Sequence, residues 1–417
     1  MARQPNRRAA TLTAALGIVA TAVASFAVGG PAYASGHASP TPVPFLGVQV
    51  VSREGAWAIA ADGPWTSTDG GKHWRLTRPM GTQAANSSWQ LSALDADVAW
   101  VVHGSAAGPS EQLFVTSDRG RRWHRYALPM VGVSSLDVVT RRVAYIVCLP
   151  QGGSMGTTWY QLWRTADGGR TWSLAASDSS SASAYTVTHS HRPSLPSGFG
   201  PTGIAFATPS RGVICQLFTP RHRDACQLTL DGGRRWSGVR LPTPKPVRRL
   251  PAYDQVVQWA SEPIVVSSRV AYLAVAFTPT ESTPLGKASG LALYRTSDGG
   301  RLWRLVHWFG RRLLPSGALQ SLGPSAPHFA FATPSAGSAF LFLGAGGSPP
   351  VRALTTRDGG ATWHAIGWPR DWQPTAPPSF SPGGGLGLLL IESGRSTYLA
   401  ATADAGGAWH LLTAQTT

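Results

Sequence analysis

The chain consists of short apolar or alternating runs that are separated by polar turns rich in glycine. Val98–His103 and Gln112–Thr116 are typical runs, and runs of this length bounded by turn residues favour β-strands over helices. They follow one another in sets of four, and seven sets fill the chain from residue 45 to its end. The first run of the fifth set is Pro263–Val266, whereas that of the seventh, near Ser379–Pro382, is degenerate. The pattern predicts an all-β protein.

A single turn motif, [ST]-x-D-x-G-x-x-W, joins the third and fourth runs of every set. Neighbouring copies are separated by 46 residues (Asp358 to Asp404) to 67 residues (Asp231 to Asp298), a period that is typical of blade or solenoid arrays. The Asp and Trp residues of the seven copies are Asp69 and Trp74, Asp118 and Trp123, Asp167 and Trp172, Asp231 and Trp236, Asp298 and Trp303, Asp358 and Trp363, and Asp404 and Trp409.

The residue types of this motif are those of a tight hairpin turn. The Asp carboxylate can accept backbone N–H groups across the loop, and Gly adopts the positive φ that such turns require. The Trp side chain is large enough to fill the space between neighbouring hairpins. We therefore interpret the motif as a structural turn and not as a chemical site. Seven units of four antiparallel strands, with the motif at each third-to-fourth strand turn, predict a seven-bladed β-propeller.

The motif resembles the Asp-box, or BNR, repeat of sialidases, sortilin-type receptors and photosystem II stability/assembly factor-like proteins. The resemblance covers nearly all of the chain after residue 44, and it implies a propeller with an Asp-box in every blade. Asp-box propellers include both enzymes and binding scaffolds, so the resemblance by itself leaves function open.

Loop lengths distinguish the two faces of the predicted propeller. The turns between first and second strands are short, and in a four-stranded meander they lie on the same face as the repeated motif. The long segments emerge on the opposite face, where variable loops on a rigid frame favour binding. We therefore expect the binding surface on this long-loop face near blades 3 to 6. The long segments are Gln151–Trp159, Ser177–Gly200, Pro242–Glu262, Thr278–Gly290 and Gly310–Pro327.

Residues 1–34 have the features of a secretion signal. A basic start with Arg7 and Arg8 precedes an apolar run, and Ala32-Tyr33-Ala34 predicts cleavage before Ser35. Twin-arginine export and an uncleaved anchor are the alternatives.

Residues 35–44 form a Pro-rich linker, and residues 45–417 form the propeller. Because seven complete sets are present, we expect the ring to close without exchanging a strand between its ends. The protein is expected to be secreted or associated with the cell envelope.

The composition is strongly basic, with a formal net charge of +16 that comes almost entirely from arginine. Nucleic acid is not the expected partner, since the chain carries an export signal. Arginines crowd the repeated motif, and they either attract an anionic partner such as an envelope polymer or form an ordinary solvated surface. The candidates for such a patch are Arg121, Arg122, Arg234, Arg235 and Arg301.

Acidic residues are too few to indicate an active site clearly. The chain has five Glu and 15 Asp, and seven of the Asp belong to the repeated motif. A propeller glycosidase needs carboxylates that converge on the central channel. The weak candidates are Asp254, Glu262 and Asp371, which are placed on inter-blade loops and could instead be loop caps or surface ion pairs.

Histidine and cysteine suggest two further features. His189, His191 and His222 could hold Zn²⁺ if their loops converged, although solvated loops are the simpler interpretation. Cys215 and Cys226 flank a hairpin loop, so an exported protein could join them in a disulfide. Cys148 would then be a buried thiol. No cofactor is expected.

Two functions follow from these observations. The first is an exported, non-catalytic propeller that binds a protein or glycan at the cell envelope and acts as a monomer. The alternative is a glycoside hydrolase of sialidase-like construction that acts on extracellular glycans. The shortage of acidic residues outside the repeated motif favours the binding scaffold.

Overall fold

A computed structural model gives the structure of the chain, which divides into two units, Met1–Ala38 and Ser39–Thr417. All described residues belong to the second unit. They are 41–82, 87–105, 111–149, 160–178, 194–195, 200–218, 224–248, 256–279, 290–310, 327–343 and 350–416.

These residues form a seven-bladed β-propeller of four-stranded antiparallel blades, which confirms the predicted fold. Blade 1 contains β1 (Phe45–Val50), β2 (Ala56–Ala60), β3 (Gly63–Ser67) and β4 (His73–Leu76). Blade 2 contains β5 (Ser87–Ala93), β6 (Ala99–Ser105), β7 (Gln112–Thr116) and β8 (His124–Ala127). Blade 3 contains β9 (Val133–Val138), β10 (Ala144–Cys148), β11 (Gln161–Thr165) and β12 (Ser173–Asp178), with β13 (Ser194–Leu195) added in parallel to β12.

The remaining blades continue the same order. Blade 4 contains β14 (Gly200–Thr208), β15 (Arg211–Phe218), β16 (Asp224–Thr229) and β17 (Ser237–Arg240), and the short helix α1 (Lys245–Arg248) follows it. Blade 5 contains β18 (Val256–Ala260) with β19 (Ile264–Val265), β20 (Ala271–Pro279), β21 (Gly290–Thr296) and β22 (Trp303–Gly310). Blade 6 contains β23 (His328–Phe331), β24 (Gly337–Phe342), β25 (Val351–Thr356) and β26 (His364–Ala365). Blade 7 contains β27 (Gln373–Pro374) with β28 (Ser379–Phe380), β29 (Gly387–Ser393), β30 (Ser396–Thr402) and β31 (His410–Leu411), and β32 (Gln415–Thr416) ends the chain.

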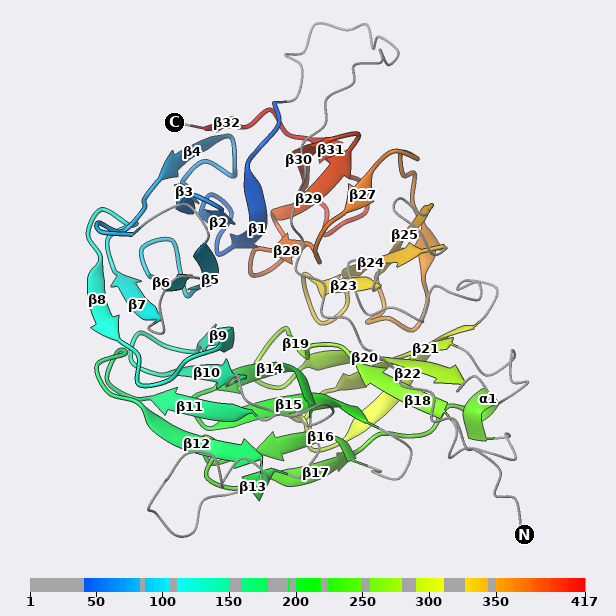
Figure 1. The fold of residues 1–417 in the computed structure, drawn as a ribbon. Helices are drawn as coiled ribbons and strands as arrows, with labels where there is room; N and C mark the ends of the chain where they lie inside the picture. The colour runs from blue at the N-terminus through cyan, green and yellow to red at the C-terminus, as the bar shows by residue number, and fades with distance from the viewer. Residues whose placement is uncertain are drawn as a thin grey trace, which may run out of the picture. The chain divides into compact units, whose positions relative to one another are not determined.

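In Figure 1 the first strands β1, β5, β9, β19, β23 and β28 surround the middle of the picture, while β4, β8, β12 and β17 lie at the rim. The second strands are almost fully buried, and all five residues of β10 are buried. These apolar strands form the packed layers between blades, which is why the sequence shows continuous apolar runs there rather than strict alternation.

The seven repeated turns share one pattern of hydrogen bonds, and we call them the repeat turns. In blade 1, Ser67 Oγ donates to Asp69 Oδ1 (2.9 Å) and accepts the N–H of Gly71 (2.9 Å). The N–H of His73 donates to Asp69 Oδ1 (3.0 Å). In addition, the N–H of Gly70 donates to the carbonyl of Glu54 in the first-to-second strand turn (2.8 Å). The two sets of short turns therefore lie together, as expected, and we call this side the repeat-turn face.

The Trp of each repeat turn, and the Gly two residues after its Asp, lie against the neighbouring blade. Trp123 Nε1 donates to the carbonyl of Thr77 in blade 1 (2.6 Å), and its ring centroid lies 6.2 Å from that of Trp57. A Cβ added to Gly169 would lie 2.5 Å from Leu113 of blade 2. The motif is thus both a turn and an inter-blade contact.

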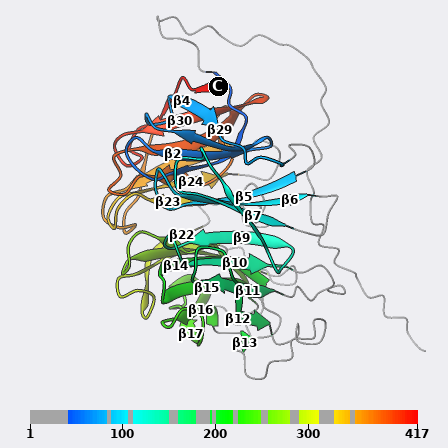
Figure 2. The same cartoon turned by 90° about the vertical axis from the view of Figure 1, so that its left-hand side faces the viewer.

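Both ends of the described chain cross between blades 1 and 7. The N–H of Val43 donates to the carbonyl of Thr397 in blade 7 (2.8 Å). At the other end, β32 pairs in parallel with β4, with Gln415 opposite His73. Figures 1 and 2 both place the C-terminal strand beside β4. Although each blade has its own four strands, the expectation of closure without strand exchange was incomplete, because β32 adds a fifth strand to blade 1.

The main departure from the predicted strands is in blade 5. Residues 256–260 were assigned to an inter-blade loop, yet they form β18, which pairs with β20 and also with β15 of blade 4. A nine-stranded sheet therefore joins blades 4 and 5. Much of the other long segments lies outside the described residues, so the binding surface expected on that face remains a prediction. In the part of the chain that the structure describes, no helix has the length and apolar character needed to cross a membrane.

Candidate functional site

The structure places only some of the predicted site residues. Asp254, His189, His191 and His222 lie outside the described residues. Asp371 is exposed, and its Oδ2 accepts a hydrogen bond from Ser393 Oγ (2.7 Å), which fits a surface loop cap. No group of three His, Cys, Asp or Glu residues that could hold a metal occurs within the described ranges.

Glu262 does not lie on an inter-blade loop, as the sequence suggested, but in the first strand of blade 5. β18 ends where Ala260 pairs with Val275, and β19 begins where Ile264 pairs with Tyr272. The N–H of Ser261 donates to the carbonyl of Ala274, so Glu262 and its neighbour Pro263 share a single opposite residue. This is the geometry of a β-bulge, which re-aims a side chain.

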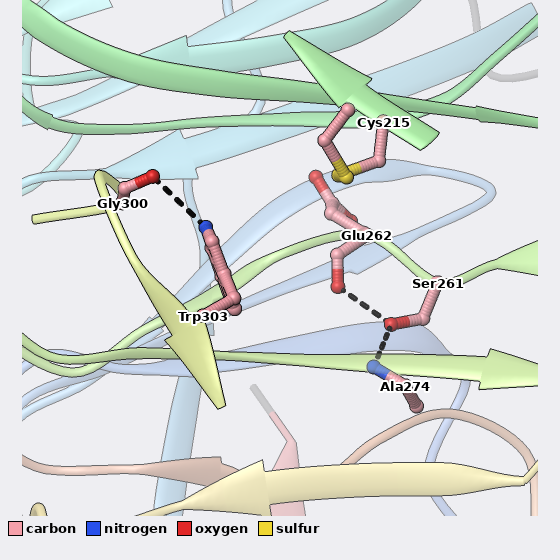
Figure 3. The surroundings of a disulfide bond; sticks show 7 residues. Cys215, Ser261, Glu262, Ala274, Gly300 and Trp303 are labelled. Carbon is pink, nitrogen blue, oxygen red and sulfur yellow. Dashed lines mark hydrogen bonds between the residues drawn. A yellow bond between two sulfur atoms is a disulfide. The ribbon is translucent and has the colours of Figure 1, made fainter. Parts of the chain in front are cut away.

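The bulge packs Glu262 against blade 4. A Cβ added to Gly203 on β14 would lie 2.5 Å from Glu262 Cβ, so a side chain larger than Gly could not occupy position 203. Figure 3 shows Glu262 beside the disulfide between Cys215 and Cys226, whose S–S distance is 2.06 Å. Ser261 stabilises the bulge, because its Oγ accepts the N–H of Ala274 (3.1 Å) and donates to the Glu262 carbonyl (3.0 Å).

A second carboxylate, Asp137, occupies a position that repeats around the first strands. Its Oδ2 accepts the N–H of Phe206 on the first strand of blade 4 (2.7 Å). The equivalent side chains of blades 1, 2 and 7 make the same kind of bond to the first strand of the next blade. In these bonds Gln49 accepts the N–H of Ala93, Ser92 accepts the N–H of Val138, and Ser379 accepts the N–H of Val50.

We call Asp137 and Glu262 the carboxylate pair, because their charges interact. Burial raises the pKa of Asp137 to about 6, although the Phe206 N–H opposes the shift. Burial also raises the pKa of Glu262 to about 7, and the charge of Asp137 adds to that shift. The Glu262 side chain is exposed to solvent, but protein atoms packed around it still disfavour its charged form.

Near neutral pH the pair can therefore hold one proton, with Glu262 the more readily protonated member. Carboxyl groups whose pKa values are raised by burial can serve as general acids, but the same shift arises in structural pairs. Sequence reasoning missed Asp137. The signal for it was an acidic residue within the apolar run Val133–Val138, at the position where other blades carry Gln or Ser.

Replacing Asp137 with Asn should stabilise the protein at high pH only. A raised pKa means that the contribution of Asp137 to stability is fully present below about pH 3.8 and is lost as pH rises through about 6. Asn keeps an acceptor for the Phe206 N–H but cannot ionise. Chemical unfolding should therefore give Asp137→Asn an advantage of about 2–3 kcal/mol at pH 8 and almost none at pH 4.

The control for this prediction is Asp137→Ala, which removes the acceptor at every pH. It should be less stable than Asp137→Asn throughout the range, by about 1 kcal/mol or more. If Asp137→Asn is less stable than the wild type at pH 8, the raised pKa assigned to Asp137 is contradicted.

The arginine candidates all lie on repeat turns and are exposed. Arg121 and Arg122 are on blade 2, Arg234 and Arg235 are on blade 4, and Arg301 is on blade 5. Within the described ranges the ion pairs are His73–Asp69, Arg119–Asp97 and Arg141–Asp95, and none includes these five arginines. The carboxylates of the repeat-turn aspartates already accept hydrogen bonds from their own turns. For example, three hydrogen bonds from Thr171 and Thr165 lower the pKa of Asp167 to about 2.

The excess of positive charge is concentrated on blades 3 to 5. Their repeat turns and first-to-second strand turns hold eight arginines and three carboxylates, whereas those of blades 1 and 2 hold four arginines, one lysine and five carboxylates. Those of blades 6 and 7 hold one arginine and two carboxylates. The eight arginines are Arg141, Arg142, Arg170, Arg211, Arg234, Arg235, Arg269 and Arg301. We call them the arginine surface.

Solved structures with the same fold include both binding proteins and enzymes. No family model matches the chain. No curated protein matches it either. A structure of YCF48 bound to a D1 peptide has a TM-score of 0.50 and 15% identity, and the match covers 85% of this chain and 92% of that one.

Two larger proteins share the fold over about half of their length. A GH74 xyloglucanase from Xanthomonas campestris has a TM-score of 0.55 and 15% identity, and the match covers 87% of this chain and 52% of that one. A prolyl endopeptidase structure has a TM-score of 0.51 and 11% identity, with coverage of 87% and 48%. At these identities the likeness concerns the fold alone.

Proposed function

We propose that this protein is a non-catalytic binding scaffold that takes an acidic segment of a partner protein on the arginine surface of blades 3 to 5. The observation that carries the proposal is the local excess of five positive charges on turns whose own carboxylates are already hydrogen-bonded. Apart from Arg141, which pairs with Asp95, the arginines of this surface make no ion pair within the described residues, and such guanidinium groups attract carboxylates and can bind them through two hydrogen bonds. Arg234, Arg235 and Arg301 are central to this surface.

The fold supports the proposal in a general way. The repeat turns are held by hydrogen bonds within the turn and to the neighbouring turn, so their arginines project from a rigid frame. The YCF48 propeller was solved with a peptide bound, so propellers of this kind do bind peptides. We further propose that the protein is exported, on the strength of residues 1–34; N-terminal sequencing of the secreted protein, expected to begin at Ser35, tests this.

Binding of a synthetic peptide rich in Asp and Glu tests the proposed function. The double variant Arg234→Ala/Arg235→Ala should weaken binding at low ionic strength by about tenfold or more, because two charge-assisted contacts are lost. The effect should shrink as salt is added. Fluorescence anisotropy of a labelled peptide provides the measurement.

The matched control removes the same charge elsewhere. Arg125 on β8 and Arg240 on β17 are exposed strand residues outside the arginine surface. The variant Arg125→Ala/Arg240→Ala should bind the peptide nearly as well as the wild type. An equal loss in both double variants would mean that net charge, and not this surface, attracts the peptide, and would refute the proposal.

The second candidate function is a glycoside hydrolase, and the carboxylate pair favours it. A protonated Glu262 and an ionised Asp137 would have the protonation states of a general acid and its partner carboxylate. Against it, Asp137 is engaged by the Phe206 N–H at a position that is structural in other blades. A panel of fluorogenic glycosides decides between them: turnover by the wild type that disappears in Glu262→Gln would establish the enzyme.

A further inference from the structure

A separate pocket lies between blades 1 and 2 on the repeat-turn face. Its volume is about 260 Å³. Blade 1 supplies Thr66, Thr68, His73, Trp74 and Arg75, and blade 2 supplies Arg119 and Arg121. The lining contains three guanidinium groups, one imidazole and two hydroxyl groups but no carboxylate. We call this the anion pocket.

The backbone at Arg119 is unusual. Its φ is +62°, in the left-handed region that residues other than Gly rarely adopt. Five other repeat turns have Gly at this position, and the sixth has Ala405 at φ +58°. Because Ala405 tolerates the same conformation, the backbone alone does not require arginine. What distinguishes Arg119 is a side chain that reaches the pocket.

Neighbouring groups hold two of the three arginines in place. Arg119 Nε donates to Asp97 Oδ1 at 2.7 Å, which leaves the four terminal N–H groups of its guanidinium for other acceptors. Arg75 Nη2 donates to the carbonyl of Arg119 at 2.9 Å, so the Arg75 side chain, which belongs to blade 1, is hydrogen-bonded to the repeat turn of blade 2. Guanidinium groups that are already ordered lose less entropy when they bind.

Three carboxylates lie near the pocket, namely Asp69, Asp97 and Asp118, and each is held by hydrogen bonds of its own. Asp97 offsets one of the three arginines. The carboxylate of Asp69 is next to the pocket, but it accepts Ser67 Oγ, the N–H groups of Lys72 and His73, and the His73 ring. Although burial opposes the shift, the hydrogen bonds from His73 and Ser67 lower the pKa of Asp69, so it stays ionised and tied to the turn. Lys72 adds another positive charge beside the pocket.

From this geometry we propose that the pocket binds a phosphate group through Arg75, Arg119 and Arg121, with Thr68 as an additional donor. Three arginines from two blades that line one pocket suit a tetrahedral oxyanion with multiple acceptors better than a planar carboxylate. The site goes beyond the acidic-peptide function, since it lies on different blades and involves none of Arg234, Arg235 and Arg301. The phosphate is either a free ion or the end group of a larger molecule.

The test is titration calorimetry of the full chain with inorganic phosphate. The wild type should bind one phosphate saturably, and Arg119→Gly and Arg121→Ala should each weaken binding by about tenfold. Arg119→Gly is the informative variant, because Gly is the residue of five other turns and suits the positive φ. It should therefore keep or raise the thermal stability while phosphate binding falls. Arg125→Ala, a neighbour outside the pocket, should bind as the wild type does.

The outcomes are distinct. Wild-type affinity in both Arg119→Gly and Arg121→Ala, an equal loss in Arg125→Ala, or no saturable binding by the wild type would each overturn the proposal. Methyl phosphate separates the two sources: affinity equal to that of phosphate indicates a phosphoryl end group, and a clear loss indicates the free ion. Arg119→Gly should leave binding of the acidic peptide unchanged, so failure here and failure of the proposed function can be told apart.

Discussion

Replacing Trp74 with alanine is expected to lower the free energy of unfolding by about 3–5 kcal/mol. The side chain is 1% exposed, and its ring centroid lies 4.8 Å from that of Phe45. It belongs to a core cluster that contains Leu388 and Leu399 of blade 7. Truncation would therefore open a cavity where the first and last blades meet. It would also remove the hydrogen bond from Trp74 Nε1 to the Gly71 carbonyl (2.7 Å).

The same substitution at another repeat turn is the control. Trp172 is only partly buried, and its Nε1 makes a longer bond to the Gly169 carbonyl (3.2 Å). Chemical unfolding should show a smaller loss for Trp172→Ala than for Trp74→Ala. If the two losses are equal, the interface between blades 1 and 7 does not contribute more to stability than the other blade interface, contrary to our prediction.

Gly169→Ala is expected to cost about 2–5 kcal/mol, the second largest effect. Its φ is +88°, which disfavours any side chain by about 1–2 kcal/mol. In addition, the new Cβ would lie 2.5 Å from Leu113 and 3.3 Å from Trp100 of blade 2. Overpacking of a well-filled core adds about 1–3 kcal/mol. Thermal and chemical unfolding measure the sum.

Gly168→Ala in the same turn separates the two causes. Gly168 has a φ of +81°, but its added Cβ would meet only the carbonyl of Arg141, at an ordinary 3.5 Å. It should therefore lose only the conformational part, about 1–2 kcal/mol. A loss at Gly168 that matches the loss at Gly169 would show that turn conformation, and not packing between blades, explains the Gly of the motif.

The chemistry of the turns was readable from the sequence because it is local. Ser67, Asp69, Gly71 and the backbone of His73 make their hydrogen bonds within seven residues, and Ser or Thr, Asp and Gly recur at the first three positions in each blade. The second role of Gly169 could not be read in this way. Its contact with Leu113 joins residues of two blades, and no pattern within a single turn reports that distance.

The candidate sites were less predictable than the fold. Glu262 was found as a rare acidic residue, yet its predicted loop was wrong, because Val256–Ala260 pairs with strands of two blades and a bulge follows. Asp137 was missed because its partner, the Phe206 N–H, lies 69 residues further along the chain. The anion pocket was missed for a similar reason: the sequence places Arg75 and Arg119 in different units, and only the packing of blades 1 and 2 joins them.

The sequence by itself determined the number of blades, the place of each repeat turn and the basic character of the chain, since these depend on residue types within single hairpins. Only the tertiary structure decided how the ring closes through β32 and which carboxylates have raised pKa values. Those properties depend on burial and on contacts between blades, and neither is encoded in the spacing of residues along one strand or turn.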